Sequence, residues 1–437
     1  MALMADNKEL LQLKKEIERH NELYHEQDNP EISDAEYDAL YQRLQELENI
    51  LGVDQDSPTQ QVGASTSRKF EKHNHLKPML SLSNVFSDED FYKFEERVLK
   101  RLNTDKTTFS VEPKFDGIGI SLTYENGNLT KAVTRGDGVT GEVVTNNIKT
   151  IAKVPHVIEY SSPKTIEIRG EVFFRLDDFS NINTRLEADN LKTFVSPRNA
   201  AAGTLRNLDI EIVKQRPLDI YFYGIGGHSD DAIYKSYEEF VNFLKKNNFP
   251  VCDLVSFGNA EHVVGSVSEI LSSREDLDYE IDGAVVKVND FLHQQKLGFV
   301  SKAPRWAVAW KFPASEKYSK VIDILFSVGR TGIVTPYATV EPVLISGANI
   351  SNVTLHNMDE LSRLDIKVND TVLVKRAGDV IPQITKVNVD VRDGSETNVN
   401  IPSQCPSCGN ALKTEGPFMK CDAGMRCPAQ LLGYFEH

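Results

Sequence analysis

Residues 111–120, VEPKFDGIGI, place charged side chains in a segment whose other residues favour a β-strand. Glu112, Lys114 and Asp116 fall on one face of that strand, because successive side chains point to opposite faces. Gly117 follows them and permits a bend or a close approach of another backbone. A solvated strand face would explain these ten residues taken alone. A functional interpretation needs support from the rest of the chain.

The whole chain has the composition of a soluble globular protein, with 40% hydrophobic and 26% charged residues among 437. This length is sufficient for two to four domains with sizeable cores. The sequence contains neither a long apolar run nor a secretory signal, so we expect no association with a membrane. Four of the five cysteines lie after residue 404, which argues against a disulfide framework and for a reducing, cytoplasmic setting.

The net charge of −15 is unfavourable for binding nucleic acid, because binding to phosphates depends on Lys and Arg. Basic residues nevertheless outnumber acidic ones in two segments, 192–216 and 296–320. Such segments are candidate anion-binding faces on an acidic background, although a solvated surface would give the same pattern.

Periodicity divides the chain into four regions that we expect to be domains: 1–69, 70–316, 317–400 and 401–437. The first region predicts two amphipathic helices, the second of which begins at a capping box formed by Ser33 and Glu36. In the second region strands outnumber helices and include a hairpin at Asn126-Gly127, which predicts largely antiparallel sheets. Short strands separated by turns predict a small β-barrel in the third region. The fold class is therefore α+β with several domains.

The C-terminal region carries a metal-binding pattern. Its cysteines form two pairs, with C-x2-C and C-x5-C spacing: Cys405, Cys408, Cys421 and Cys427. Four thiolates at this spacing suit a structural Zn²⁺ site with tetrahedral geometry. Four buried or disulfide-linked cysteines are the alternative, which the spacing and a reducing setting disfavour. We expect the isolated Cys252 to be a core residue.

Basic residues and glycines recur in motifs that suit a phosphate-bearing ligand. A nucleophilic lysine must be neutral, and nearby cations or desolvation favour that form. Lys287 and Lys311 are candidate cations beside Lys114 if their strands converge. Arg135 lies in a Gly-rich turn and Arg198 in the segment SPRNAAAG, and both positions suit a phosphate. A surface position would explain any one of these residues, but not their joint occurrence.

The order of these motifs resembles that of the nucleotidyltransferases. KFDG, RGE, IDGAVVKV and WAVAWKF follow one another as in DNA ligases, RNA ligases and mRNA capping enzymes. The chain is most similar to the bacterial NAD-dependent DNA ligases, through stretches such as YHEQDNPEISDAEYD, TRGDGVTGE, SPRNAAAGTLRNLD, VGRTGIVTP and RAGDVIPQ. The resemblance extends from about residue 20 to about residue 430 and is highly specific.

The resemblance implies adenylyl transfer in three steps. Lys114 would attack the α-phosphorus of NAD, release nicotinamide mononucleotide (NMN) and carry AMP on its ε-nitrogen. The AMP would pass to the 5′-phosphate of a nick in duplex DNA, and the 3′-hydroxyl would then displace it, in replication and repair. Mg²⁺ or Mn²⁺ would neutralise phosphate charge. Asp116 would orient the amine, accept its proton or hold the metal, and the sequence does not choose among these roles.

The resemblance also implies binding residues. Glu112 would lie at the adenosine, Gly117 would let the backbone approach the nucleotide, and Lys287 and Lys311 would bind its phosphate. Further nucleotide contacts would come from Ser81, Leu82, Arg135 and Glu171. The phosphates of the nick or the adenylate would contact Arg198, Arg206 and Arg274. The N-terminal helices would contact the cationic nicotinamide half of NAD through aromatic and acidic residues and their neighbours: Tyr24, His25, Asp34, Ala35, Glu36, Tyr37 and Asp38.

The barrel is similar to the OB-fold of this family, which would grip the duplex near the nick, and the zinc module would support the barrel and touch the DNA backbone. We expect a monomer. Phe115 stands where the family more often has a smaller aliphatic residue, which raises a question of packing. The chain stops at His437, before the helix-hairpin-helix array and BRCT domain usual in the family, so we expect self-adenylation with weak nick sealing.

Two other classes of protein share part of this pattern. A nucleotidyltransferase that uses ATP or GTP, such as an RNA ligase or capping enzyme, shares the Lys114 motif but has no use for the segment from Tyr24 to Asp38. A non-catalytic nucleic-acid-binding protein with OB and zinc modules needs neither Lys114 nor Arg135. An adenylyl mass gain with NAD but not ATP, lost in Lys114→Ala, would distinguish the ligase from both.

Overall fold

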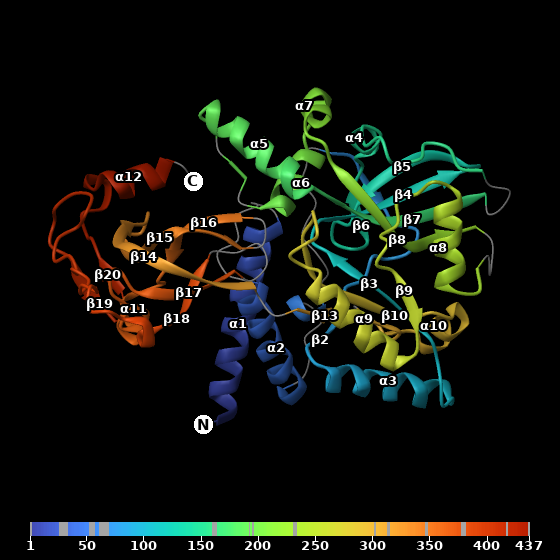
Figure 1. The fold of residues 1–437 in the computed structure, drawn as a ribbon, viewed down its shortest axis with the longest axis horizontal. Coiled ribbons are helices and arrows are strands. Elements are labelled where there is room, and N and C mark those ends of the chain that lie inside the picture. The colour runs from blue at the N-terminus through green and yellow to red at the C-terminus, as the bar shows by residue number, and fades with distance from the viewer. Residues whose placement is uncertain are drawn as a thin grey trace. The chain divides into compact units, whose positions relative to one another are not determined.

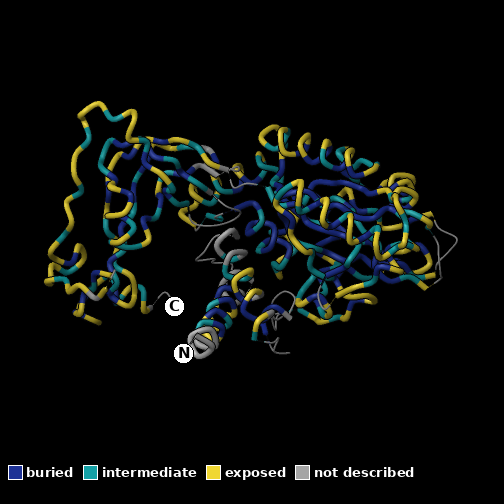
Figure 2. The backbone as a smooth tube through the Cα atoms, turned by 90° about the horizontal axis from the view of Figure 1, so that it is seen from below, coloured by how far each residue is buried: buried dark blue, intermediate teal, exposed yellow. Residues whose placement is uncertain are grey.

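The chain folds into two compact units in the computed structural model (Figure 1). The larger unit comprises residues 1–31 and 36–313, and the smaller comprises 32–35 and 314–437. Buried residues line the interior of each unit, as Figure 2 shows. The structure describes residues 2–25, 34–51, 57–60, 70–159, 164–191, 193–194, 196–229, 234–300, 303–312, 315–345, 348–376, 382–416 and 418–435.

Two helices, α1 (Ala2–His25) and α2 (Asp34–Leu51), open the chain, as the periodicity predicts. Their apolar stripes form a small shared core: Leu10, Leu13, Ile17, Leu44 and Leu47. A short 3₁₀ turn, η1 (Pro58–Gln60), is tied to α2 because the hydroxyl of Thr59 donates to the buried carboxylate of Glu48 at 2.5 Å. The predicted capping box at Ser33 lies outside the described residues.

A five-stranded sheet in the larger unit has the strand order β2-β13-β10-β3-β9. Its strands are β2 (Ser83–Val85), β3 (Phe109–Phe115), β9 (Ser256–Gly258), β10 (Ile281–Val288) and β13 (Ala307–Lys311). All of its pairings are antiparallel except that of β2 with β13. Its core also takes in residues from three helices: α3 (Asp88–Leu102), α9 (Ala260–Ser272) and α10 (Phe291–Leu297).

A four-stranded antiparallel sheet has the order β5-β4-β7-β8. Its strands are β4 (Ile118–Glu125), β5 (Asn128–Thr134), β7 (Thr165–Phe173) and β8 (Asp219–His228). Asn126 and Gly127 have φ angles of 49° and 80°, the left-handed values that the predicted hairpin turn requires. This hairpin confirms the prediction made from the Asn-Gly pair.

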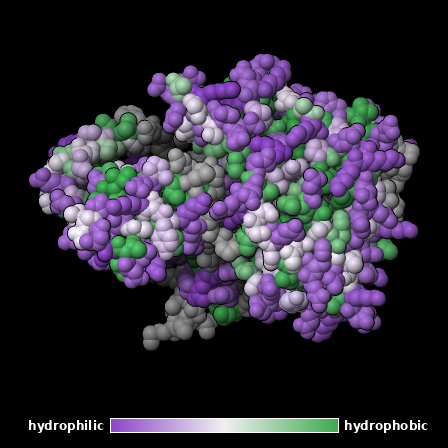
Figure 3. All heavy atoms as spheres, in the orientation of Figure 1, coloured by the Kyte–Doolittle hydropathy of each residue, from purple (hydrophilic) through white to green (hydrophobic). Residues whose placement is uncertain are grey.

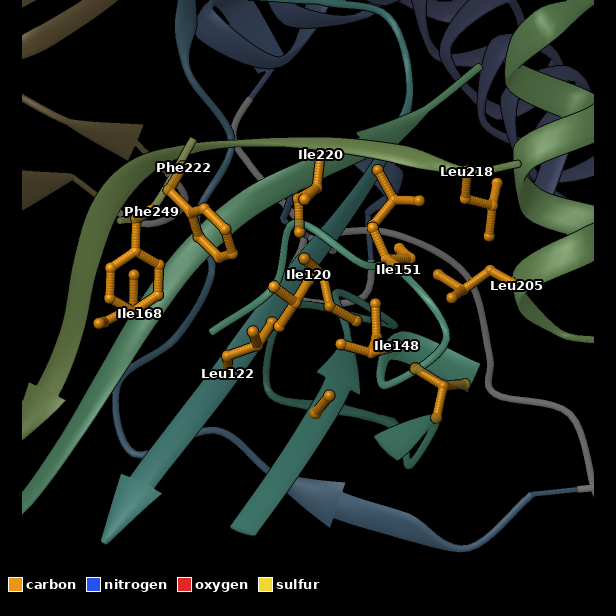
Figure 4. Packing of buried hydrophobic residues seen from close by; sticks show 14 of the residues in the cluster. Ile120, Leu122, Ile148, Ile151, Ile168, Leu205, Leu218, Ile220, Phe222 and Phe249 are labelled. Atoms are coloured by element: carbon orange, nitrogen blue, oxygen red, sulfur yellow. The ribbon is translucent and has the colours of Figure 1, made fainter. Parts of the chain in front are cut away.

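Five helices accompany the four-stranded sheet: α4 (Thr145–Ile148), α5 (Leu176–Ala188), α6 (Pro197–Leu205), α7 (Ile210–Gln215) and α8 (Tyr237–Lys246). Figure 4 shows how Ile148 of α4 and Leu205 of α6 lie in one core with Ile120 and Leu122 of β4. Two short strand pairs complete the unit: β1 (Lys72–Asn74) with β6 (Thr140–Glu142), and β11 (Phe299–Val300) with β12 (Ala303–Pro304).

The stretch VEPKFDGIGI connects the two sheets. Strand β3 ends at Phe115 and β4 begins at Ile118, so Asp116 and Gly117 carry the chain from one sheet to the other. A side chain at Gly117 would place its Cβ 2.3 Å from the carbonyl oxygen of Val172 on β7, which is closer than real contacts allow. The close backbone approach predicted at this glycine is therefore an approach to a neighbouring strand.

The smaller unit contains the predicted barrel. Its strands are β14 (Ser315–Val328), β15 (Ile333–Ile345), β16 (Ala348–Thr354), β17 (Thr371–Arg376) and β18 (Gln383–Val387). They pair in the order β14-β17-β18-β16-β15, and β15 pairs again with β14, which closes the barrel. Helix α11 (Met358–Leu364) lies between β16 and β17, and the 3₁₀ turn η2 (Val389–Val391) follows β18. Apolar side chains, including Val321, Val340 and Val372, fill its interior.

The cysteine-bearing segment continues from the barrel sheet. Strands β19 (Lys413–Glu415) and β20 (Phe418–Lys420) pair with each other, and β20 pairs with β15. The 3₁₀ turn η3 (Gly424–Arg426) and helix α12 (Pro428–Phe435) follow. Across the described residues of both units, no helix is long and apolar enough to cross a membrane. Figure 3 shows that hydrophilic side chains cover most of the visible face.

Candidate active site

Two lysines on different strands share one carboxylate in the five-stranded sheet. The ammonium group of Lys114 donates to Asp282 Oδ2 at 2.9 Å, and that of Lys311 donates to the same oxygen at 3.1 Å. The side chain of Lys114 is 27% exposed, which makes it the most exposed of the three. We call Lys114, Asp282 and Lys311 the shared-carboxylate cluster. Two cations around one anion leave a positive excess, which suits a phosphate ligand.

Strand register brings these residues together. Gly283 on β10 lies opposite both Lys114 on β3 and Lys311 on β13, so the lysines flank a residue without a side chain. The β3–β10 register shifts just before Gly283, where a β-bulge adds Asp282 as an extra residue. This bulge lets the carboxylate reach both lysines. A side chain at Gly283 would place its Cβ 2.2 Å from the carbonyl oxygen of Trp310, so only glycine fits there.

The charges of the cluster keep Asp282 ionised. Burial acts to raise its pKa, but the adjacent ammonium groups of Lys114 and Lys311 outweigh burial and hold the pKa of Asp282 well below its ordinary range. The other carboxylate oxygen, Oδ1, is buried, and no described group forms a hydrogen bond with it. Oδ1 is therefore a buried acceptor without a hydrogen-bond donor among the described residues.

A second ion pair lies further along the same two strands. Lys287 on β10 pairs with Glu112 on β3, and its ammonium group also donates to the carbonyl oxygen of Tyr223 at 2.8 Å. Tyr237, the first residue of α8, donates its hydroxyl proton to Glu112 Oε2 at 2.7 Å. We call Glu112, Lys287 and Tyr237 the capped pair. Because Glu112 lies two residues from Lys114 on one strand face, about 7 Å separates the two groups along β3.

Asp116 is paired with an arginine from a helix N-terminus. Arg198 donates from Nη1 to Asp116 Oδ1 at 2.7 Å. Arg198 lies in the first turn of α6, where the hydroxyl of the N-cap Ser196 accepts from the N–H of Asn199 and Pro197 takes the first helical position. The local sequence therefore starts a helix at the point where the arginine meets the connection between the two sheets.

The four-stranded sheet contributes Glu171 on β7 and Tyr223 on β8. The Tyr223 hydroxyl donates to Glu171 Oε2 at 3.0 Å. Burial raises the pKa of Glu171 to about 7, although nearby Arg198 and Lys114 act to lower it. Burial and then Glu171 itself raise the pKa of Tyr223 well above its ordinary value, so this hydroxyl stays protonated and donates. Glu171 therefore titrates near neutral pH beside a fixed donor.

Arg135 and Ser81 also meet in the larger unit. Arg135, which follows β5, donates from Nη2 to Ser81 Oγ at 3.2 Å. The segment before Ser81 is held to β7 because Arg169 donates to the carbonyl oxygen of Pro78 at 3.2 Å. Leu82, the next predicted contact, is partly buried beside Ser81. The fold thus brings a residue before β2 to the end of β5.

The remaining predicted residues lie on other elements. Arg206 caps the C-terminus of α6, and Arg274 follows the end of α9. Tyr37 stacks on Tyr41 with their ring centroids 6.0 Å apart and packs against the α1–α2 core. The other predicted residues of the N-terminal helices have side chains outside the described part of the chain: Tyr24, His25, Asp34, Ala35, Glu36 and Asp38.

Three residues of this arrangement are not singled out by the sequence: Asp282, Tyr223 and Tyr237. The sequence does contain a signal for Asp282, because the Asp-Gly pair of KFDG recurs in IDGAVVKV. The first pair lies where the chain passes from one sheet to the other, and the second lies at the shift in strand register. The two tyrosines carry no local sign of a polar role. Their partners come from distant strands, and a strand or helix-start tyrosine is ordinarily a packing residue.

The four C-terminal cysteines converge within the smaller unit. Their sulfur atoms all lie within 4.8 Å of one another, with 3.9 Å between Cys405 and Cys427 and 3.5 Å between Cys408 and Cys421. Four Zn–S bonds of about 2.3 Å in a tetrahedron would separate the sulfur atoms by about 3.8 Å. All five cysteines of the chain are free thiols, and Cys252 is buried in the larger unit, as predicted. The cluster is therefore compatible with one tetrahedral ion.

Curated relatives are similar over nearly the whole chain. The DNA ligase of Thermodesulfovibrio yellowstonii is 46% identical over 437 residues, which cover 98% of this chain and 65% of that protein. The DNA ligase of Marinobacter nauticus is 44% identical over 432 residues, which cover 97% and 64%. The chain thus spans slightly less than two thirds of these relatives. A solved structure titled "Pmar-Lig_Pre." aligns with a TM-score of 0.37 at 11% identity, over 71% of this chain and 68% of that one, which is too weak for inference.

Three family models match successive parts of the chain. The DNA ligase-like N-terminal NAD+-binding domain matches residues 4–63, the NAD-dependent DNA ligase adenylation domain matches 67–315, and the NAD-dependent DNA ligase OB-fold domain matches 318–396. These matches confirm the resemblance and the predicted OB-fold, and they do not favour the two other classes. Because the adenylation model alone covers more than half of the sequence, the chain belongs to the family of NAD-dependent DNA ligases.

Proposed function

We propose that this protein seals 5′-phosphate/3′-hydroxyl nicks in duplex DNA through a lysyl-AMP intermediate, with NAD as the adenylyl donor. The observation that carries the proposal is the shared-carboxylate cluster, in which Lys114 and Lys311 share Asp282. A partly exposed lysine with a second cation beside it suits attack on a phosphate group. Family membership supports the reaction class and NAD as the cofactor.

In the first step, the neutral amine of Lys114 attacks the α-phosphorus of NAD. The ammonium group of Lys114 first loses one proton to solvent to give this amine. A nitrogen–phosphorus bond then forms as the phosphorus–oxygen bond to the NMN phosphate breaks and NMN leaves, and the nitrogen gives its second proton to solvent. Asp282, held ionised, orients the amine, and Lys311 places positive charge where the phosphate oxygens gain negative charge. A bound Mg²⁺ or Mn²⁺ would supply further charge neutralisation.

The capped pair is suited to the adenine base. Glu112 offers an acceptor and Lys287 a donor, which match the N6 amino group and the N1 acceptor at one edge of adenine. The resemblance places Lys287 at the phosphate, but its contacts are with Glu112 and tyrosines, whereas Lys311 lies with Lys114. The separation of about 7 Å along β3 leaves room for the ribose between base and phosphate.

Other predicted residues complete the proposed site. Ser81, Leu82, Arg135 and Glu171 would contact the nucleotide. Asp116 would hold Arg198 in position for a phosphate of the nick or adenylate, which Arg206 and Arg274 would also contact. The match to an N-terminal NAD+-binding domain supports NMN recognition by the N-terminal helices. The residues proposed for it are Tyr24, His25, Asp34, Ala35, Glu36, Tyr37 and Asp38.

The smaller unit would act on DNA. The OB-fold barrel would bind the duplex near the nick, and Zn²⁺ held by the four cysteines would stabilise the segment after the barrel. We further propose that the protein works as a monomer in the cytoplasm, in DNA replication and repair. Metal analysis of the purified protein should find about one zinc per chain, and Cys427→Ser should lower this content without changing adenylation.

Intact-mass measurement after incubation with NAD or with ATP tests the function directly. The protein should gain one adenylyl group with NAD and none with ATP, and Lys114→Ala should abolish the gain. Lys131→Ala serves as the matched control, because Lys131 is a lysine of the same unit that lies against His73. An adduct with ATP would instead favour a different nucleotidyltransferase. Release of AMP and joining of a labelled nicked duplex by the adenylated protein would test the later steps.

A further inference from the structure

Tyr237 belongs to the capped pair, although neither the family motifs nor the sequence pattern marks it. Its side chain is buried, with 2% of the residue exposed, and its hydroxyl lies 2.7 Å from Glu112 Oε2 and 2.7 Å from the carbonyl oxygen of Tyr223. One phenol proton serves one acceptor. The proton goes to Glu112, because a charged carboxylate oxygen is a stronger acceptor than a carbonyl oxygen, and the Tyr223 carbonyl also receives a hydrogen bond from Lys287.

The same tyrosine also fixes the lysine. The Lys287 ammonium group lies 4.2 Å from the centroid of the Tyr237 ring and 5.4 Å from that of Tyr223. It pairs with Glu112 Oε1, so Lys287 and Tyr237 hold the two oxygens of this carboxylate separately. Burial and then Glu112 raise the pKa of Tyr237 well above its ordinary value, which keeps the hydroxyl a donor at any working pH.

We infer that Tyr237 is a positioning residue that sets the base specificity of the nucleotide site. The inference rests on the proposed function, in which Glu112 accepts from the adenine amino group and Lys287 donates to N1. Hypoxanthine presents the opposite pattern, because its N1 carries a proton and its C6 carries an oxygen. With both groups fixed, Glu112 would meet that oxygen and Lys287 would meet the proton, and neither contact forms a hydrogen bond.

Removal of the hydroxyl should relax this discrimination. In Tyr237→Phe, Glu112 Oε2 loses its donor, and the carboxylate is free to rotate and give both oxygens to Lys287. A mobile pair is able to exchange positions, with the acceptor at N1–H and the donor at the C6 oxygen. The variant should therefore lose affinity for NAD and gain relative tolerance of the hypoxanthine analogue. A purely structural tyrosine would affect both dinucleotides alike.

Single-turnover adenylation of the full chain tests the inference, with NAD and with the NAD analogue that carries hypoxanthine in place of adenine. The wild-type protein should favour NAD by at least about 100-fold in rate at subsaturating cofactor. Tyr237→Phe should reduce this ratio by about tenfold, mainly through a rise in KM for NAD. The ratio is measured within one variant, so a smaller folded fraction cancels out of it.

Tyr124→Phe is the matched control, because Tyr124 is also a buried phenol whose hydroxyl donates to a carbonyl oxygen, that of Pro155, at 2.6 Å. It should leave the ratio at the wild-type value. An unchanged ratio in Tyr237→Phe would overturn the inference while leaving the proposed function intact. Absence of any adduct in the wild-type protein with NAD would instead overturn the proposed function.

Discussion

The two ends of the β3–β10 strand pair carry lysine–carboxylate groups of different character. In the shared-carboxylate cluster, Lys114 and Lys311 compete for Asp282, and the group has a positive excess. In the capped pair, Glu112 and Lys287 neutralise each other under a tyrosine hydroxyl. The shared-carboxylate cluster is therefore suited to bind an anion and to take part in the reaction. The capped pair is suited to bind a neutral ring that carries hydrogen-bond donors and acceptors.

The difference arises from local backbone geometry rather than residue type. Both groups combine lysine and carboxylate on adjacent antiparallel strands. At one end a bulge and Gly283 admit Asp282 between two lysines from flanking strands. At the other end the register is regular, and a diagonal pair of Glu112 and Lys287 forms, as neighbouring strands allow. The one-residue bulge at Asp282 thus accounts for the difference between the charged cluster and the neutral pair.

The largest expected effect is a kinetic difference between substitutions of Lys311 and Lys287. Lys311→Met should lower the maximal adenylation rate by about 100- to 1,000-fold with little change in KM for NAD, because it removes charge stabilisation in the transition state. Lys287→Met should act mainly on KM, because a base contact is made equally in ground and transition states. Rapid-quench adenylation over a range of NAD concentrations measures both. Equal losses of maximal rate in the two variants would contradict this division of roles.

Removal of the shared carboxylate should destabilise the larger unit. Asp282→Asn leaves two ammonium groups without their anion, at a cost of roughly 3 kcal/mol in the free energy of unfolding at neutral pH. The low pKa of Asp282 means that its stabilisation is complete above about pH 4 and is lost in stronger acid as the carboxyl group protonates. Urea unfolding at several pH values should show the difference from wild type shrinking toward acid. A difference independent of pH would refute the ionic explanation.

Titration of Glu171 should change the free energy of unfolding by less than that of Asp282, and with the opposite dependence on pH. Its pKa is raised from 4.5 to about 7, so the folded chain binds more protons than the unfolded chain between these values. Stability should therefore fall as the pH rises from about 5 to about 8, by on the order of 2 kcal/mol relative to Glu171→Gln. Urea midpoints of both proteins at the two pH values measure the change. Parallel pH profiles would show that Glu171 titrates in its ordinary range.

The smallest effect concerns Phe115, which precedes the connection between the two sheets. Its ring stacks on Phe173 with centroids 6.0 Å apart and also contacts Tyr221 and Tyr279. Phe115→Leu should cost about 1 kcal/mol of stability and leave the adenylation rate within about threefold, because the aromatic neighbours and not the cluster lose contacts. Phe222→Leu, in the core of the other sheet, is the control for stability. A rate loss as large as that of Lys311→Met would place Phe115 in the chemistry.

Local patterns predicted much of the fold. The apolar stripes of α1 and α2, the Asn126-Gly127 hairpin and the run of short strands in the barrel each express a preference that neighbouring residues determine. Helices α3 and α9 were not predicted individually. Charged and apolar residues alternate in α3, and a solvated segment would show the same pattern. In the fold, Phe91 and Phe94 of this helix are buried in the core of the five-stranded sheet.

The site was predicted less completely than the fold. The sequence placed Lys114, Glu112, Lys287 and Lys311 on strands and left their grouping open. The grouping depends on strand register, which joins residues such as Lys114 and Asp282 across 168 positions of the chain. Sequence periodicity carries no information on such pairings. Tyr237 was missed for the same reason, since its partner Glu112 lies 125 positions away.

The sequence by itself determined the kinds of chemistry available: an amine on a strand, a glycine suited to a close approach at Gly117, and four thiols at a metal-binding spacing. Only the tertiary structure decided that Lys311 shares a carboxylate with Lys114 and that Lys287 is neutralised by Glu112. The reason is physical. Residue type sets which charges a chain carries, but the register, the bulge at Asp282 and the absent side chain of Gly283 set the distances between those charges, and the energy of a charge depends on its neighbours.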